Sequence, residues 1–143
     1  MQRTLSYCIT VLKKDFDFFC DERLAQLGLT RGLLFFLIYI GRHPGCSPSV
    51  LSDALRADTG HTARSVDKLV QSGFVLRARS DNDRRAFTLR LTQQGEDTFE
   101  AVRALFTEWD AHVLKDADAQ ECEAALSFLL SLIHPKEGVH GAS

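Results

Sequence analysis

The stretch DTGHTARSVDKLVQS, residues 58–72, decides the fold of this 143-residue chain. Its apolar positions recur at helical spacing, which predicts a helix over about residues 60–72 with one packed face, made of Ala63, Val66, Leu69 and Val70. The opposite face is expected to carry only cationic or hydrogen-bonding side chains, namely His61, Arg64, Ser65, Lys68 and Ser72. Asp58 or Thr59 caps the start of this helix, and Gly73 ends it.

Two further helices are predicted before this one. Ser47 is a good N-cap and Pro48 suits the first helical position of a short helix, whose inner face is expected to hold Val50, Leu51, Ala54 and Leu55. The apolar run 33–40, between Thr30 and the stop at 43–45, predicts a helix of about 13 residues that is buried all round. A strand is the competing interpretation of such a run, and the Thr30 cap and the length favour the helix.

A β-hairpin is predicted directly after residues 60–72. Residues 74–79 read as one strand, residues 80–85 as a polar turn, and residues 87–91 alternate as a half-buried partner strand. Two helices with a tight connection, followed by a hairpin, make a winged helix-turn-helix. The predicted fold is therefore mainly α with a small β-hairpin wing.

Long helices are predicted on both sides of this lobe. The first ends at Gly28 and carries an apolar stripe at heptad-like spacing, Leu5, Ile9, Leu12, Phe16 and Phe19. The second is capped by Thr92 and carries the stripe Phe99, Val102, Phe106, Trp109 and Val113. The third begins at a capping box of Asp118 and Glu121 and runs to about Ile133.

The winged lobe is too small to cover all of these stripes, so we expect a second copy to bury them in a homodimer. The predicted organisation is an N-terminal dimerisation helix over 1–29, a DNA-binding lobe over 30–92, C-terminal dimerisation helices over 93–133, and a flexible tail over 134–143.

Charge is unevenly distributed along the chain. The net charge is −2, but residues 56–90 hold eight Lys and Arg against four Asp, whereas residues 93–143 hold three basic and ten acidic side chains. A basic segment beside an acidic one indicates a polyanion-binding face on an otherwise acidic body.

Several classes of protein are disfavoured by what the sequence lacks. No apolar run reaches the roughly 20 residues of a membrane span, and no signal peptide is recognisable, so we expect a cytoplasmic protein without a membrane partner. The four cysteines have no Cys-x-x-Cys spacing and are expected to be reduced. Because no nucleophile elbow, phosphate-binding glycine loop, paired carboxylate motif or four-ligand metal spacing is present, we expect no enzyme activity, no metal and no cofactor.

The polar face predicted over residues 60–72 suits the major groove of double-stranded DNA. Arg64 and Lys68 have the chemistry to bind guanine edges or phosphates, and His61 and Ser65 to read bases or position the helix. An arginine at the hairpin tip suits the minor groove, and the N–H groups after Ser47 suit a phosphate. The predicted DNA-contacting residues are Ser47, Ser49, Thr59, His61, Thr62, Arg64, Ser65, Lys68, Arg79, Asp83, Arg84 and Arg85.

Residues 27–95 resemble the MarR family of bacterial regulators. The resemblance is carried by the run 27–30, Pro44-Gly45, the stretch 58–69, residues 73–75, Arg77, the wing Asp83-Arg84-Arg85, and Leu91-Thr92 with Gly95. It implies a transcriptional regulator, more often a repressor than an activator, that binds a pseudo-palindromic operator as a homodimer.

The same resemblance assigns individual roles. It implies that Arg64 is the arginine of the recognition helix and that Arg85 is the wing arginine, held by Asp83. His61 and Ala63 stand where family members more often carry small hydroxyl residues, and Gly60 weakens the first turn of the helix. These departures bear on the operator sequence rather than on the activity.

The resemblance also implies two modes of control. Family members commonly respond to small aromatic or phenolic ligands in a crevice between the dimer helices and the DNA-binding lobe, for which the candidates are Phe16, Phe35, Tyr39, Phe106 and Trp109, with a place in the core as the alternative for most of them. Some branches sense oxidants through a cysteine, and Cys8 and Cys46 are candidates because Cys8 lies on the first helix and a helix start near Cys46 favours a thiolate.

A winged helix used only as a protein-interaction module is a further alternative, but its exposed helix face would be apolar.

Overall fold

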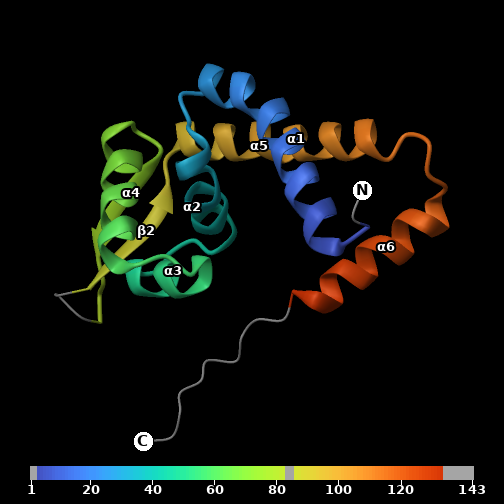
Figure 1. Cartoon of the computed structure of the whole chain (residues 1–143). Helices are drawn as coiled ribbons and strands as arrows, with labels where there is room; N and C mark the ends of the chain where they lie inside the picture. The colour runs from blue at the N-terminus through green and yellow to red at the C-terminus, as the bar shows by residue number, and fades with distance from the viewer. Residues whose placement is uncertain (1–2, 83–85, 134–143) are drawn as a thin grey trace, which may run out of the picture. The chain divides into compact units, whose positions relative to one another are not determined.

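The computed structural model describes residues 3–82 and 86–133. In that part of the chain six helices accompany a two-stranded sheet, as Figure 1 shows. The elements are α1 (Leu5–Gln26), α2 (Arg31–Arg42), α3 (Pro48–Leu55), α4 (Thr59–Gln71), β1 (Val75–Arg79), β2 (Phe87–Leu91), α5 (Gln93–Val113) and α6 (Ala119–Leu132). This is the mainly helical winged-helix arrangement that the sequence predicts. Two compact units divide the chain, Met1–Thr107 and Glu108–Ser143.

The hairpin of the first unit is antiparallel. Val75 pairs with Leu91 and Arg79 with Phe87, so the strands are in register along their whole length. The backbone of Cys46 adds a single bridge to Leu89, which ties the connection between α2 and α3 to the second strand. The wing is therefore fixed to the helix-turn-helix at its base.

Side-chain caps begin four helices as predicted, namely α3, α4, α5 and α6. The Ser47 hydroxyl accepts the Val50 N–H at 3.2 Å, and the Asp58 carboxylate accepts the His61 N–H at 2.7 Å. Asp118 forms the predicted capping box at the start of α6. Thr30 has the extended backbone of an N-cap, but its side chain makes no capping hydrogen bond.

The start of α5 is locked to the end of α4 by a short motif. The Thr92 hydroxyl accepts the Gly95 N–H at 3.0 Å and donates to the carbonyl of Gly73. A Cβ at Gly95 would lie 2.1 Å from the Phe74 carbonyl oxygen, so only glycine fits there. The Leu-Thr-x-x-Gly pattern thus holds the wing, α4 and α5 in one arrangement.

The core of the first unit is built around α2, which packs against α3, α4 and β2 (Figure 1). Leu34, Leu37 and Ile40 are its fully buried residues. The expectation that α2 is buried all round is wrong at Phe35, which is 46% exposed. In α3 the inner residues are Leu51, Ser52 and the half-buried Leu55, whereas Val50 and Ala54, predicted on that face, are exposed.

The first part of the α5 stripe belongs to this same core. Phe99, Val102 and Leu105 are buried, and Phe106 packs on Phe16 of α1 with ring centroids 5.2 Å apart. The single chain therefore buries these side chains itself. The prediction that the stripe from Phe99 onward forms the dimer surface is wrong for this part, and Val102, with no exposed surface, cannot contact a second copy.

Apolar surface is left exposed on two other helices. α6 has no buried residue, and the large apolar side chains exposed on it and at its C-cap are Leu126, Phe128, Leu129, Leu130, Leu132 and Ile133. α1 exposes Leu5, Tyr7, Ile9, Val11, Leu12 and Phe18. None of the described helices alone is long and apolar enough to cross a membrane; α1 and α2 meet that criterion only as a pair, bent by 77°.

Candidate nucleic-acid interface

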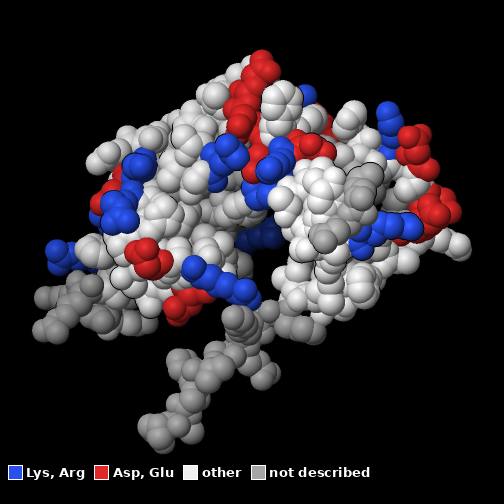
Figure 2. All heavy atoms as spheres, in the orientation of Figure 1, with Lys and Arg blue, Asp and Glu red and all other residues white. Residues whose placement is uncertain are grey.

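The exposed face of α4 is the candidate interface. His61, Arg64 and Lys68 are exposed, as predicted, while Val66 and Leu69 anchor the opposite face in the core. Figure 2 shows Lys and Arg side chains at the surface over α4, with a few acidic side chains between them. A cationic, hydrogen-bonding ridge with an apolar back is thus present on the second helix of the helix-turn-helix.

Two predicted contact residues lie on the wrong side of α4. Thr62 is 1% exposed and Ser65 is 4% exposed, so both face the core and neither reaches a groove. Ala63, predicted to be inside, is exposed instead. The reason is geometric: positions 62, 65, 66 and 69 share one helical face. The predictions for Ala63 and Ser65 were wrong because they followed the polarity of these small side chains rather than their position on the helix.

At the start of α4, a glycine makes room for the arginine. The Arg64 Nη1 atom lies 3.2 Å from where a Cβ of Gly60 would be, so its guanidinium folds back over the first turn. The N–H of His61 lowers the pKa of Asp58, and the charge of Arg64 lowers it further. Gly60, which we expected only to weaken the helix, gives Arg64 space beside the N-cap carboxylate.

An ion pair joins the recognition helix to the wing. The Arg77 guanidinium, on β1, donates to the carboxylate of Asp67, on α4. The same guanidinium lies over the ring of Phe87, on β2, 5.7 Å from its centroid. Sequence reasoning missed this contact, because a separation of ten residues across an element boundary has no periodic signature.

The other predicted contacts are distributed around α4. Ser49, Thr59 and Arg79 are exposed, and Ser47 is half-buried in its capping role. Asp83, Arg84 and Arg85 lie outside the described residues. The exposed face also includes Gln71, two turns after Arg64, which the sequence analysis did not select although its spacing places it there.

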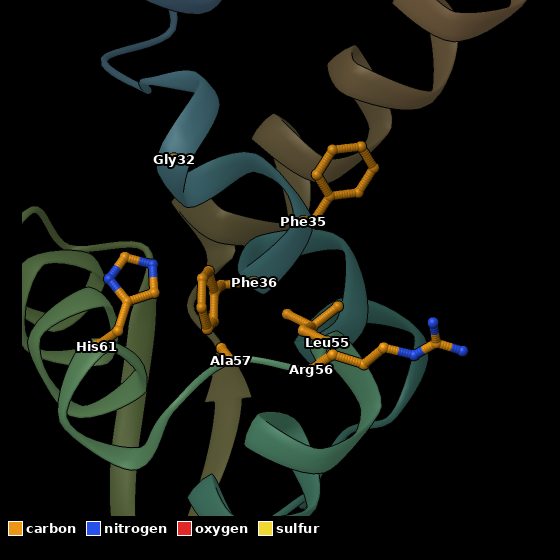
Figure 3. Close-up of a pocket in the computed structure, with 7 residues that line it drawn as sticks. All are labelled: Gly32, Phe35, Phe36, Leu55, Arg56, Ala57 and His61. Atoms are coloured by element: carbon orange, nitrogen blue, oxygen red, sulfur yellow. The ribbon is translucent and has the colours of Figure 1, made fainter. Parts of the chain in front are cut away.

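A pocket of about 390 Å³ opens behind the first turn of α4. Its lining residues are Gly32, Phe35, Phe36, Leu55, Arg56, Ala57 and His61. The ring centroids of Phe36 and His61 are 5.6 Å apart, with an interplanar angle of 69°. Figure 3 shows these two rings beside each other, with the Arg56 guanidinium directed away from them. The pocket therefore contacts the recognition helix itself.

Of the five aromatic residues predicted to line a ligand crevice, Phe35 alone lines this pocket. Phe16 and Phe106 pack on each other, and Tyr39 stacks on His43 with ring centroids 4.2 Å apart. Trp109 lies in the second unit. The pocket beside α4 is therefore not lined by the predicted set of aromatic residues.

The cysteine candidates differ in their surroundings. Cys8 is exposed on α1, and Cys46 is half-buried beside β2. Burial raises the pKa of the Cys46 thiol, which opposes the thiolate that we expected a helix start to favour. No group of three or more potential ligands among His, Cys, Asp and Glu is close enough to hold a metal ion within 3–82 and 86–133.

The fold and the exposed ridge of α4 define a winged helix-turn-helix protein. A model of the MarR family matches residues 29–87. Over 137 residues the chain is 44% identical to the HTH-type transcriptional regulator BilQ of Clostridium symbiosum (strain WAL-14163), with 96% of this chain and 95% of that protein covered. A MarR transcriptional regulator from Methanosarcina mazei Go1 has the same fold with a TM-score of 0.80 at 27% identity, covering 92% of this chain and 95% of that one.

A MarR-family regulator from Listeria monocytogenes, solved in complex with a 26mer DNA, shares the fold with a TM-score of 0.82 at 19% identity, over 92% of this chain and 87% of that one. The chain belongs to the MarR family of transcriptional regulators, as the resemblance in its sequence predicts.

Proposed function

We propose that this protein binds double-stranded DNA by placing α4 in the major groove. The observation that carries the proposal is the division of α4 into an exposed face with His61, Arg64 and Lys68 and a buried face anchored in the core. Such a helix presents donors to base edges while its back holds it rigid. A regulator with this fold has been solved with DNA.

Residues around α4 complete the proposed interface. Ser49 and Thr59, at the starts of α3 and α4, are placed to bind phosphates, and Arg79 extends the cationic surface along β1. From the family resemblance we further propose that Arg84 or Arg85 enters the minor groove, with Asp83 orienting it.

We infer that the protein acts as a homodimer through α6 and α1. Burying one large apolar side chain stabilises an interface by about 1.5–3 kcal/mol. Leu126, Leu129, Leu130 and Ile133 are exposed on one face of α6 and its C-cap, so a two-fold interface brings together eight such side chains, enough to offset an association cost of about 4–15 kcal/mol. Two-fold symmetry then presents two copies of α4 roughly 34 Å apart, which matches a pseudo-palindromic operator. Repression follows when such an operator overlaps a promoter.

The DNA proposal is tested by salt-dependent binding to duplexes enriched by the protein from a random-sequence library. Arg64→Ala and Lys68→Ala are expected to weaken binding, and Ser65→Ala is expected to leave it unchanged because Ser65 is buried. A protein-interaction module would bind DNA weakly and would not enrich a sequence. Enrichment of no sequence by the wild-type protein would refute the proposal.

The dimer proposal is tested by the mass of the protein in solution. Replacing Leu126 and Leu130 together by Glu is expected to yield monomers that bind the enriched duplex poorly. Leu76→Glu is the matched control for the mass alone, since Leu76 is an exposed leucine on β1 rather than on α6. A dimer that survives both α6 substitutions would place the interface elsewhere.

We further propose that a small aromatic or phenolic ligand in the α4 pocket releases the DNA. The pocket is within the size range of small-molecule sites, its walls are mainly apolar, and His61 belongs to both the pocket and the exposed ridge. Benzoate and phenol are the first probes. Gly32→Leu is expected to fill the pocket, since an added Cβ would lie 3.8 Å from the Thr30 hydroxyl oxygen, in ordinary van der Waals contact. It is expected to abolish release while DNA binding persists. Release that is equally efficient in Gly32→Leu would exclude this site.

A further inference from the structure

We propose that Arg77 is a DNA-contacting residue that binds a backbone phosphate, and that Asp67 is the residue that positions it. The inference rests on the DNA binding through α4 proposed above. It adds a contact that lies outside α4 and outside the wing tip.

The geometry places Arg77 at the edge of the DNA-facing surface. Asp67 lies on the exposed side of α4, one turn after Arg64 and one turn before Gln71. Because the Arg77 guanidinium donates to the Asp67 carboxylate, it lies at the edge of the same surface. One third of the Arg77 side chain is exposed, so the guanidinium is open to a ligand from that side.

The chemistry of the pair favours a phosphate over a closed ion pair. A bare carboxylate on a DNA-facing surface repels phosphates, and Arg77 neutralises that of Asp67. A guanidinium has five N–H donors, and one carboxylate leaves several of them for a second anion. The Phe87 ring, whose centroid lies 5.7 Å from the Arg77 Cζ atom, restricts the guanidinium and so lowers the entropy lost on binding.

The position of Arg77 in the chain also suits a phosphate. β1 leads from the end of α4 to the wing, so Arg77 stands between the element proposed to read the major groove and the one proposed to read the minor groove. A DNA backbone separates those two grooves. A contact there would set the register of both reading elements.

The competing interpretation is that Asp67 neutralises the charge of Arg77 and that the ion pair only holds the wing against α4. The two interpretations differ in salt dependence, since each cation that neutralises a phosphate adds about one to the slope of log affinity against log salt concentration. An arginine whose charge is consumed adds nothing to this slope.

The experiment measures fluorescence anisotropy of the enriched duplex and of a scrambled duplex over a range of salt concentrations. Replacing both residues, Asp67→Asn together with Arg77→Ala, is expected to reduce the slope by about one for each protomer without leaving a bare carboxylate, and Arg77→Lys alone is expected to retain the slope. Asp67→Asn is expected to keep the wild-type slope but to lower the preference for the enriched duplex, because no carboxylate then positions the Arg77 guanidinium. Thermal unfolding of each variant verifies that it is folded.

Arg103→Ala is the matched control. Arg103, on α5, also pairs with an acid, Glu100 at 3.2 Å, and also lies over a ring, that of Phe99 at 5.9 Å. Its removal is expected to leave the slope unchanged. A wild-type slope when both Asp67 and Arg77 are replaced, or tighter binding with a steeper slope in Asp67→Asn, would overturn the assignment while DNA binding itself stood. Absence of DNA binding by the wild-type protein would instead overturn the proposed function.

Discussion

Replacing Thr62 by valine is expected to stabilise the protein by about 1–2 kcal/mol. The Thr62 side chain is 1% exposed, and its hydroxyl oxygen has no hydrogen-bond partner among the residues that the structure describes. A buried hydroxyl without a partner costs about 1–3 kcal/mol relative to one in water. Valine has the same branched shape and a similar helix propensity, so the change removes the polar penalty and leaves no cavity.

The assay is thermal unfolding followed by circular dichroism at a fixed protein concentration, because the Tm of the proposed dimer would depend on concentration. A gain of 1 kcal/mol corresponds to a rise of about 3–5 °C in a chain of this size. Thr107→Val is the control: that hydroxyl is exposed and donates to the Arg103 carbonyl at 3.2 Å, so its loss is expected to change stability by about 0.5 kcal/mol or less.

Two results would contradict this reasoning. An unchanged or lowered Tm in Thr62→Val would show that the hydroxyl is satisfied in solution. A raised Tm with weaker DNA binding would restore Thr62 as a DNA contact, which its burial here opposes.

The remaining predictions concern a tight packing site, a cap and two thiols. Gly95→Ala is expected to destabilise by about 3 kcal/mol in a thermal melt, because its Cβ would overlap the Phe74 carbonyl; a neutral result would show that α5 moves freely. The pKa of the Asp58 carboxyl is lowered in the folded state, so its ionised form stabilises the fold above the unfolded-state pKa of about 3.9. This stabilisation is lost as the pH falls through the lower folded-state pKa. Asp58→Asn should therefore flatten the pH dependence of Tm below about pH 4. Iodoacetamide should alkylate exposed Cys8 before Cys46, whose pKa burial raises; the reverse order in a mass spectrum would revive Cys46 as a redox sensor.

Features set by local chemistry could be predicted from the sequence. Ser47, Asp58 and Asp118 cap their helices because a short polar side chain with an extended backbone satisfies the N–H two or three positions later. The second strand has the bounds expected from its alternation, 87–91. The family motif at Thr92 and Gly95 is likewise local, since it depends on one hydroxyl and one missing Cβ.

Features set by packing between distant segments could not be predicted. Val102 looked like part of a dimer stripe because its spacing continues through residue 113, and only the folded lobe shows which part of α5 the protomer buries. Ser65 was assigned to the exposed face of α4 for its polarity. A serine is small enough to be buried between α4 and the core, so at position 65 the place on the helix determines burial and polarity does not.

The number of positive charges that face DNA cannot be obtained by counting the basic residues of the sequence. The eight basic residues of 56–90 exceed the acidic ones by four, yet they serve different purposes in the fold. Arg56 lines the pocket, Arg64 folds over the first turn of α4, and Arg77 is paired with Asp67. The Arg77–Asp67 pair either strengthens or weakens the binding of phosphates. The outcome determines how many charges the chain contributes to binding the duplex. The salt slope of the variant with both Asp67→Asn and Arg77→Ala measures this number directly, and no count of the residues in the segment replaces it.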